Sequence, residues 1–107
     1  MKLFIDDVRE PPDRSWIVCR DVDTALILTF ELWHNLTTIS IDHDMGTNVD
    51  GSLAKTGYDY LCAIERRTVD APLMGLSPKP ELIIHSANPV GRDNMQRAIN
   101  SIVYRLG

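Results

Sequence analysis

Residues 38–44 read TISIDHD, an apolar run typical of a buried strand followed at once by charged side chains. The same pattern occurs three times in the chain. The residues that follow the three apolar runs are Asp6-Asp7 after KLFI, Asp42-His43-Asp44 after TISI, and His85-Ser86-Ala87-Asn88 after ELII. In a parallel α/β sheet the strands point the same way, so the residues just past their ends meet along one edge, where ligands bind. The pattern therefore predicts one shared site at that edge.

Strand-like and helix-like segments alternate along the rest of the chain. Short apolar runs predict strands, and apolar residues at helical spacing predict helices. The expected strands are 2–5, 16–19, 38–42 and 81–85, and the expected helices are about 22–35, one beginning near 56–57, and about 91–106. The polar or proline-rich segments 45–55 and 69–80 are expected to be loops. This order predicts one α/β domain over residues 1–107, with helices on the faces of a mainly parallel four-stranded sheet.

The first connection, residues 6–15, differs from the others. Its adjacent prolines, Pro11 and Pro12, make a continuous helix improbable, so the first crossover helix is expected to be reduced or missing. Without that helix, strand 16–19 could run parallel or antiparallel to strand 2–5. The predicted site uses the ends of the other three strands and is the same in both cases.

The composition excludes some classes of function. The chain has 107 residues, 44% of them hydrophobic, as in an ordinary soluble domain. A net charge of -4 argues against general DNA binding and against attraction to acidic membranes. There is no signal peptide and no apolar run near the roughly 18–20 residues of a membrane span, so a cytoplasmic location is expected.

Cys19 and Cys62 match no metal motif and are expected to be buried free thiols. The oligomeric state is left open.

The aspartates of the first two sets predict a metal site. Adjacent carboxylates repel each other, and a divalent cation such as Mg²⁺ or Mn²⁺ relieves that repulsion. Asp42 and Asp44 would point to the same side if their strand continued. The candidate metal ligands are Asp6, Asp7, Asp42 and Asp44, with the choice between Asp6 and Asp7 open. The alternative is that these aspartates only cap loops, with Asp7 paired to Arg9.

The remaining polar residues indicate proton transfer and phosphate binding. Histidine titrates near neutral pH, which suits acid/base catalysis, and a helix that starts after Asn-Pro-Val-Gly offers positive charge to a phosphate. The candidate catalytic residues are Asp42, His43, His85 and Ser86, and the candidate substrate-binding residues are Asn88 and Arg92. Two structural alternatives stay open: a half-buried His85 with satisfied hydrogen bonds, and a surface Arg92 paired with Asp93.

Several segments together resemble a known family. The Asp6-Asp7 pair, the Asp42-x-x-Met45 run and the Ser86-Ala87 pair are similar to the site of response-regulator receiver domains. The segments LFIDDVREPP, ISIDHDMG, TGYDYL and HSANPVGRDNM, which span residues 3–95, resemble more closely a divergent branch, the cyclic-phosphate processing receiver-like family. The resemblance implies a receiver-like (flavodoxin-like) three-layer domain. It also implies a phosphoesterase that acts on cyclic phosphates, such as 2′,3′-cyclic RNA ends or cyclic nucleotides.

One departure from ordinary receivers affects the expected function. Receivers keep a lysine after a fifth strand, whereas the only lysines here are Lys2, Lys55 and Lys79, none at a matching place. This disfavours phosphorelay signalling, and the extra histidines favour metal-dependent hydrolysis of a small phosphorylated substrate or RNA end. Two alternatives remain. One is a non-catalytic degenerate receiver that binds a phosphorylated or cyclic nucleotide or a partner protein, and the other is metal-free catalysis by the two histidines.

Overall fold

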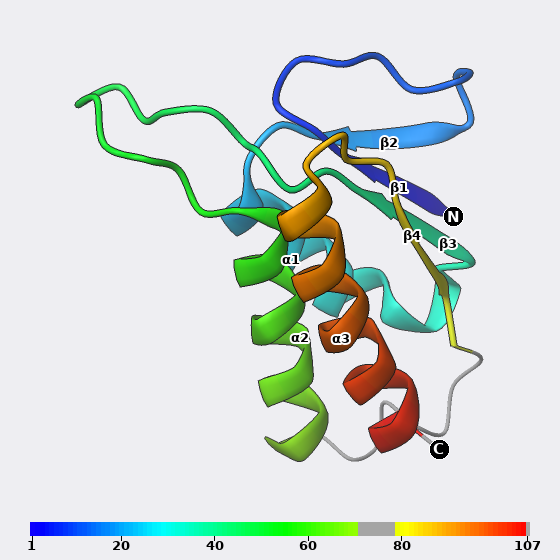
Figure 1. Ribbon diagram of the computed structural model, residues 1–107. Coiled ribbons are helices and arrows are strands. Elements are labelled where there is room, and N and C mark those ends of the chain that lie inside the picture. The colour runs from blue at the N-terminus through cyan, green and yellow to red at the C-terminus, as the bar shows by residue number, and fades with distance from the viewer. Residues whose placement is uncertain (71–78, 107) are drawn as a thin grey trace.

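A computed structural model describes residues 1–70 and 79–106 and shows a sheet packed on three α-helices (Figure 1). The elements, in chain order, are β1 (Lys2–Ile5), β2 (Trp16–Cys19), α1 (Val22–Leu32), the 3-10 helix η1 (Trp33–Asn35), β3 (Thr38–Ile41), α2 (Gly57–Asp70), β4 (Glu81–Ile84) and α3 (Pro89–Leu106). The predicted elements are confirmed, with ends that differ by up to three residues; the predicted helix 22–35 is divided into α1, which ends at Leu32, and η1. Residues 69 and 70 belong to α2 instead of the predicted loop, and 71–78 lie outside the described residues.

The sheet is parallel throughout, with strand order β2-β1-β3-β4. This settles the open question about β2, which runs parallel to β1. The register pairs Ile5 with Cys19 and with Ile41, and Ile41 with Ile84, so all four strands end at the same level. A parallel sheet with aligned carboxyl ends is what the three sets of polar residues require.

The connection between β1 and β2 contains no helix, as its two prolines predicted. The parallel α/β, receiver-like fold class is therefore confirmed together with the missing first crossover helix. The three-layer expectation, however, needs a correction. Within the described residues, α1, α2 and α3 all lie on one face of the sheet (Figure 1).

Right-handed crossovers explain why α1 and α2 cover the same face. The β2-to-β3 and β3-to-β4 connections move in the same direction along the sheet, so their helices pack on the same face. Only the β1-to-β2 connection moves the other way, and it has no helix to place on the second face. The core forms between the helices and the inward residues of the strands, including Leu3, Ile5, Ile39 and Ile41. We call the opposite side, which carries Phe4, the helix-free face.

Both cysteines are free thiols, as predicted, but only one is fully buried. Cys19 is 1% exposed, and burial raises its pKa to about 11, so it is a poor nucleophile. Cys62 is half-buried. No helix in the described part of the chain is long and apolar enough to cross a membrane.

Candidate functional site

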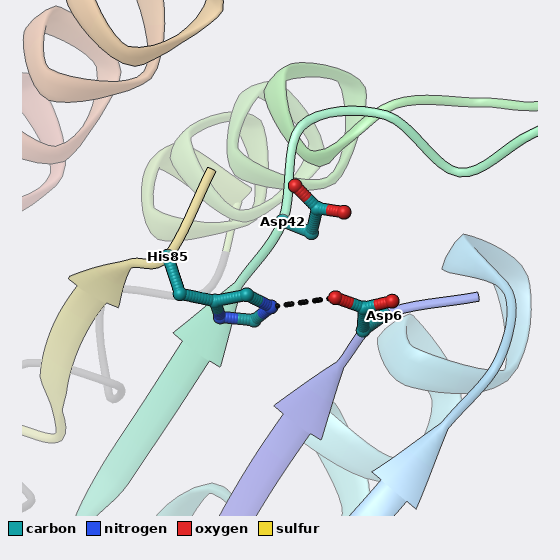
Figure 2. A group of neighbouring side chains, drawn as sticks. All are labelled: Asp6, Asp42 and His85. Carbon is teal, nitrogen blue, oxygen red and sulfur yellow. Dashed lines mark hydrogen bonds and ion pairs between the residues drawn. The ribbon is translucent and has the colours of Figure 1, made fainter. Parts of the chain in front are cut away.

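Three side chains meet just beyond the strand ends: Asp6 after β1, Asp42 after β3 and His85 after β4 (Figure 2). Their backbone still follows the sheet, because Asp42 N–H donates to Ile5 O at 2.9 Å and His85 N–H donates to Ile41 O at 3.0 Å. One oxygen or nitrogen from each side chain lies within 4.8 Å of the other two. Register alone therefore brings together residues that lie 79 positions apart.

Asp6 is fully buried and has four hydrogen-bonding neighbours around its carboxylate and carbonyl. Its Oδ1 accepts from the N–H groups of Val8 at 2.9 Å and Arg9 at 2.8 Å, and its Oδ2 lies 3.0 Å from His85 Nε2. Arg20 Nη1 donates to its backbone carbonyl at 3.2 Å. Burial raises the pKa of the carboxyl, but the two amides and His85 outweigh it and hold the pKa below its ordinary value. Asp6 is therefore ionised at neutral pH.

His85 reaches Asp6 by crossing β3, since β3 separates β4 from β1 in the sheet. Its ring lies flat on Phe4 of β1, with 4.5 Å between ring centroids and 4° between planes. Its Nδ1 lies 2.7 Å from the hydroxyl oxygen of Ser40, which is on β3 beneath it. Both ring nitrogens therefore have partners, and the side chain is 18% exposed.

Asp42 has the opposite electrostatic environment to Asp6. It is 9% exposed, and burial together with the nearby Asp6 charge raises the pKa of its carboxyl above the ordinary value. The N–H of His43, which donates to Asp42 Oδ1 at 2.8 Å, and the positive charge of Arg9 only partly offset this. Two buried carboxylates this close are costly unless a cation lies between them.

Asp7, Asp44 and His43 lie outside the group of three. Asp44 does not align with Asp42, because β3 ends at Ile41 and the alternation of side chains stops there. It is exposed instead, and its Oδ1 lies 2.8 Å from His43 Nδ1. Asp7 lies against Gly46, whose φ is 76°; a Cβ added there would come within 2.7 Å of Asp7 Oδ2.

His43 points toward the start of α3. A Cβ added at Gly91 would lie 2.5 Å from its ring, so the imidazole packs directly on the helix backbone. His43 also lines a cavity of about 340 Å³, together with Asp44 and parts of the 45–56 loop; Asp6, Asp42 and His85 are not among its lining residues. That volume is within the range of small-molecule sites.

The residues around the start of α3 bond mainly to one another. The buried Ser86 Oγ accepts from Asn88 N–H at 3.1 Å, and Asn88 Oδ1 accepts from Gly91 N–H at 3.0 Å and so caps the helix. Arg92 Nη1 donates to the carbonyls of Ser86 at 3.0 Å and Ile84 at 3.3 Å. These bonds fix the turn between β4 and α3, and Arg92 contributes a positive charge beside it.

Comparison with known families agrees with the fold. A family model described as the cyclic-phosphate processing receiver domain matches residues 1–101. The chain belongs to this family. No match was found among curated proteins or solved structures. The family description associates this receiver with the processing of cyclic phosphates.

The side chains of the group fit a divalent cation in this receiver. Two carboxylates and one imidazole provide two oxygen donors and one nitrogen donor. Carboxylates suit Mg²⁺ and Mn²⁺, whereas imidazole is more typical of transition metals. The mixed donor set therefore favours Mn²⁺ over Mg²⁺.

Two residues of this receiver site were missed in the sequence. Ser40 lies on β3, two positions before Asp42, and the alternation of side chains along the predicted strand 38–42 could have placed it on the same side as Asp42. Arg9 was considered only as a partner for Asp7. Its Nη1 instead donates to the carbonyl of His85 at 3.1 Å, which ties the first connection to β4.

Proposed function

We propose that this receiver is a metal-dependent phosphoesterase that opens cyclic phosphates, such as 2′,3′-cyclic RNA ends or cyclic nucleotides. The observation that carries the proposal is the meeting of Asp6, Asp42 and His85 at the carboxyl edge of the sheet, in a family described by cyclic-phosphate processing. The buried, closely spaced carboxylates give the site a need for positive charge that a cation would meet.

Asp6, Asp42 and His85 would hold the cation. A divalent cation at such a site polarises a phosphoryl oxygen and lowers the pKa of water. Asp6 suits a permanent ligand because its carboxyl is ionised over a wide pH range. Asp42, whose pKa is raised, is the carboxylate whose charge a cation would stabilise most.

His43 and Asp44 would form the proton-transfer pair. Asp44 Oδ1 lies 2.8 Å from His43 Nδ1 and would keep that nitrogen protonated, leaving Nε2 as the basic atom. His43 lines the cavity of about 340 Å³, where the rest of a substrate would fit. The charge of Arg92 and the dipole of α3 would attract the phosphate. Pro89 has no N–H, and the N–H of Gly91 already donates to Asn88 Oδ1. We therefore expect the helix dipole to contribute more to phosphate binding than direct hydrogen bonds from backbone amides.

³¹P NMR of a cyclic-phosphate panel tests the proposal. The panel holds 2′,3′- and 3′,5′-cyclic nucleotides and an RNA with a cyclic end, each with Mg²⁺, Mn²⁺ or EDTA. The expected result is a monoester signal that depends on the cation and is lost in Asp42→Asn. His43→Gln is expected to slow turnover by about 10²–10⁴-fold, the usual contribution of general acid–base catalysis. His34→Gln, which changes a histidine at the opposite end of the sheet, is the matched control.

Each contrary result has a defined meaning. Turnover that persists in EDTA and in Asp42→Asn would contradict the metal scheme and support catalysis by the histidines alone. Unchanged spectra from folded protein would contradict hydrolysis altogether. A non-catalytic binding module would be supported in that case. Such a module would gain thermal stability from a cyclic nucleotide without converting it.

A further inference from the structure

We infer that Ser40 is a positioning residue that selects the ring orientation and the tautomer of His85 and thereby lets His85 Nε2 serve as a cation ligand. The inference rests on the proposed function, because it concerns the same cation site. It concerns a residue inside a strand, with a side chain only 6% exposed, which no substrate would contact directly.

Two contacts together define the orientation of the His85 ring. Stacking on Phe4, at 4.5 Å and 4°, fixes the plane of the ring but would tolerate a half-turn about the Cβ–Cγ bond. The Ser40 hydroxyl, 2.7 Å from Nδ1, distinguishes the two orientations, because after the half-turn a carbon atom would face it. Only the observed orientation points Nε2 at Asp6 Oδ2, 3.0 Å away. The Ser40 contact at Nδ1 and the Asp6 contact at Nε2 therefore both favour the orientation in which a nitrogen, and not a carbon, faces the carboxylates.

The position of Ser40 also requires a small residue. The His85 ring comes from β4 and passes over β3 to reach β1, and Ser40 is the β3 residue that it contacts on the way. Serine combines a short side chain, which leaves room for the ring, with a hydroxyl that both donates and accepts hydrogen bonds.

That dual capacity matches what a metal-binding histidine needs. Without a cation, the Asp6 carboxylate accepts from Nε2–H, so Nδ1 carries a lone pair and Ser40 donates to it. For Nε2 to bind a cation, it must release its proton to solvent while Nδ1 takes one up, so the imidazole remains neutral. Ser40 then changes from donor to acceptor and holds the new Nδ1–H. Metal-binding histidines commonly donate their second N–H to such a partner, and its loss typically costs 10–100-fold in metal affinity.

The test combines ¹⁵N NMR of the imidazole with cation titration by calorimetry. In the wild-type protein without metal, His85 is expected to carry its proton on Nε2. Zn²⁺, a diamagnetic probe that binds imidazole, is expected to move the proton to Nδ1. Ser40→Ala is expected to raise the Kd for Mn²⁺ at least tenfold. The matched control is Thr38→Ala, which removes a hydroxyl two residues earlier on the same side of β3.

The outcomes separate this inference from the function on which it rests. Wild-type affinity for Mn²⁺ in Ser40→Ala would overturn the inference and leave the proposed function standing. A wild-type protein that binds neither cation would overturn the proposed function and the inference with it. If Ser40→Ala fails to fold, the wild-type spectrum still decides: a proton on Nδ1 in the absence of metal contradicts the assigned hydrogen bonds.

Discussion

Asp42→Asn should make the metal-free protein more stable while it removes the response to a cation. The carboxylate of Asp42 is buried beside that of Asp6, and both effects raise its pKa. A carboxyl whose pKa is raised in the folded state contributes stability that is fully present below its unfolded pKa and is lost as the pH rises through the folded pKa. Asparagine resembles the protonated form and can still accept the hydrogen bond from His43 N–H. The repulsion is therefore removed and the local geometry is kept.

The expected gain follows from the separation of the charges. The ligand atoms of Asp6 and Asp42 lie no more than 4.8 Å apart. At that distance, Coulomb's law gives a repulsion of roughly 3.5 kcal/mol with an effective dielectric constant of about 20, and roughly 0.9 kcal/mol in bulk water. His85 and Arg9 offset part of it. A net gain of about 1 kcal/mol remains, which corresponds to a melting temperature about 4–6 °C higher for a domain of this size.

Thermal denaturation at pH 7, followed by circular dichroism with EDTA or with Mn²⁺, measures both effects. Mn²⁺ at about 100 times its Kd should stabilise the wild-type protein by about 2.7 kcal/mol, and it should not stabilise Asp42→Asn. Asp44→Asn, which removes the same charge from a side chain 65% exposed, should change neither value appreciably. The advantage of Asp42→Asn should disappear below pH 3.8, where the wild-type carboxyl is also protonated. If Asp42→Asn has a lower melting temperature than the wild type in EDTA, this reasoning is refuted. Asp42 would then stabilise the fold as a hydrogen-bond acceptor.

Three further results are expected. Tyr60→Phe removes a buried hydroxyl 2.6 Å from Thr29 Oγ1 and should destabilise the fold by about 1 kcal/mol in urea titrations, and an unchanged midpoint would contradict this. Gly57→Ala places a Cβ 2.1 Å from the carbonyl oxygen of Asp42 and should cost roughly 1–3 kcal/mol by the same measurement, whereas a neutral effect would mean that the start of α2 can move. The lowered pKa of Asp6 contributes stability that is present above about pH 3.8 and is lost as the pH falls through the folded pKa. In Asp6→Asn, the urea midpoint should therefore change less with pH over that acid range. A midpoint that changes with pH as much as in the wild type would assign the acid sensitivity to other groups.

The sequence was sufficient for the strands and for the edge at which the site lies. Three apolar runs, each followed by polar residues, predict parallel strands, and the register then brings Asp6, Asp42 and His85 together. The prolines at 11 and 12 correctly predicted the missing helix. These features depend on local chain properties and on the common direction of parallel strands, both of which can be read from one sequence.

The details of the group could not be predicted, because they depend on where each strand ends. Asp44 was grouped with Asp42 on the assumption that β3 continues, but the strand stops at Ile41 and Asp44 turns toward His43. His85 was predicted to take part in proton transfer, and this stays a prediction; its position beside both carboxylates was not predicted. A strand assignment wrong by a single residue reverses the direction of a side chain.

The missing helix and the position of the His85 ring concern the same face of the sheet. A right-handed crossover from β1 to β2 would lay its helix on the helix-free face, over β1, where the His85 ring now stacks on Phe4. The two prolines of the first connection remove that helix, and the ring of His85 takes the vacated surface. It can then extend from β4 across Ser40 to Asp6. The absence of the first crossover helix would therefore leave room for the nitrogen donor of the proposed cation site, which links the Pro11-Pro12 sequence to that proposal.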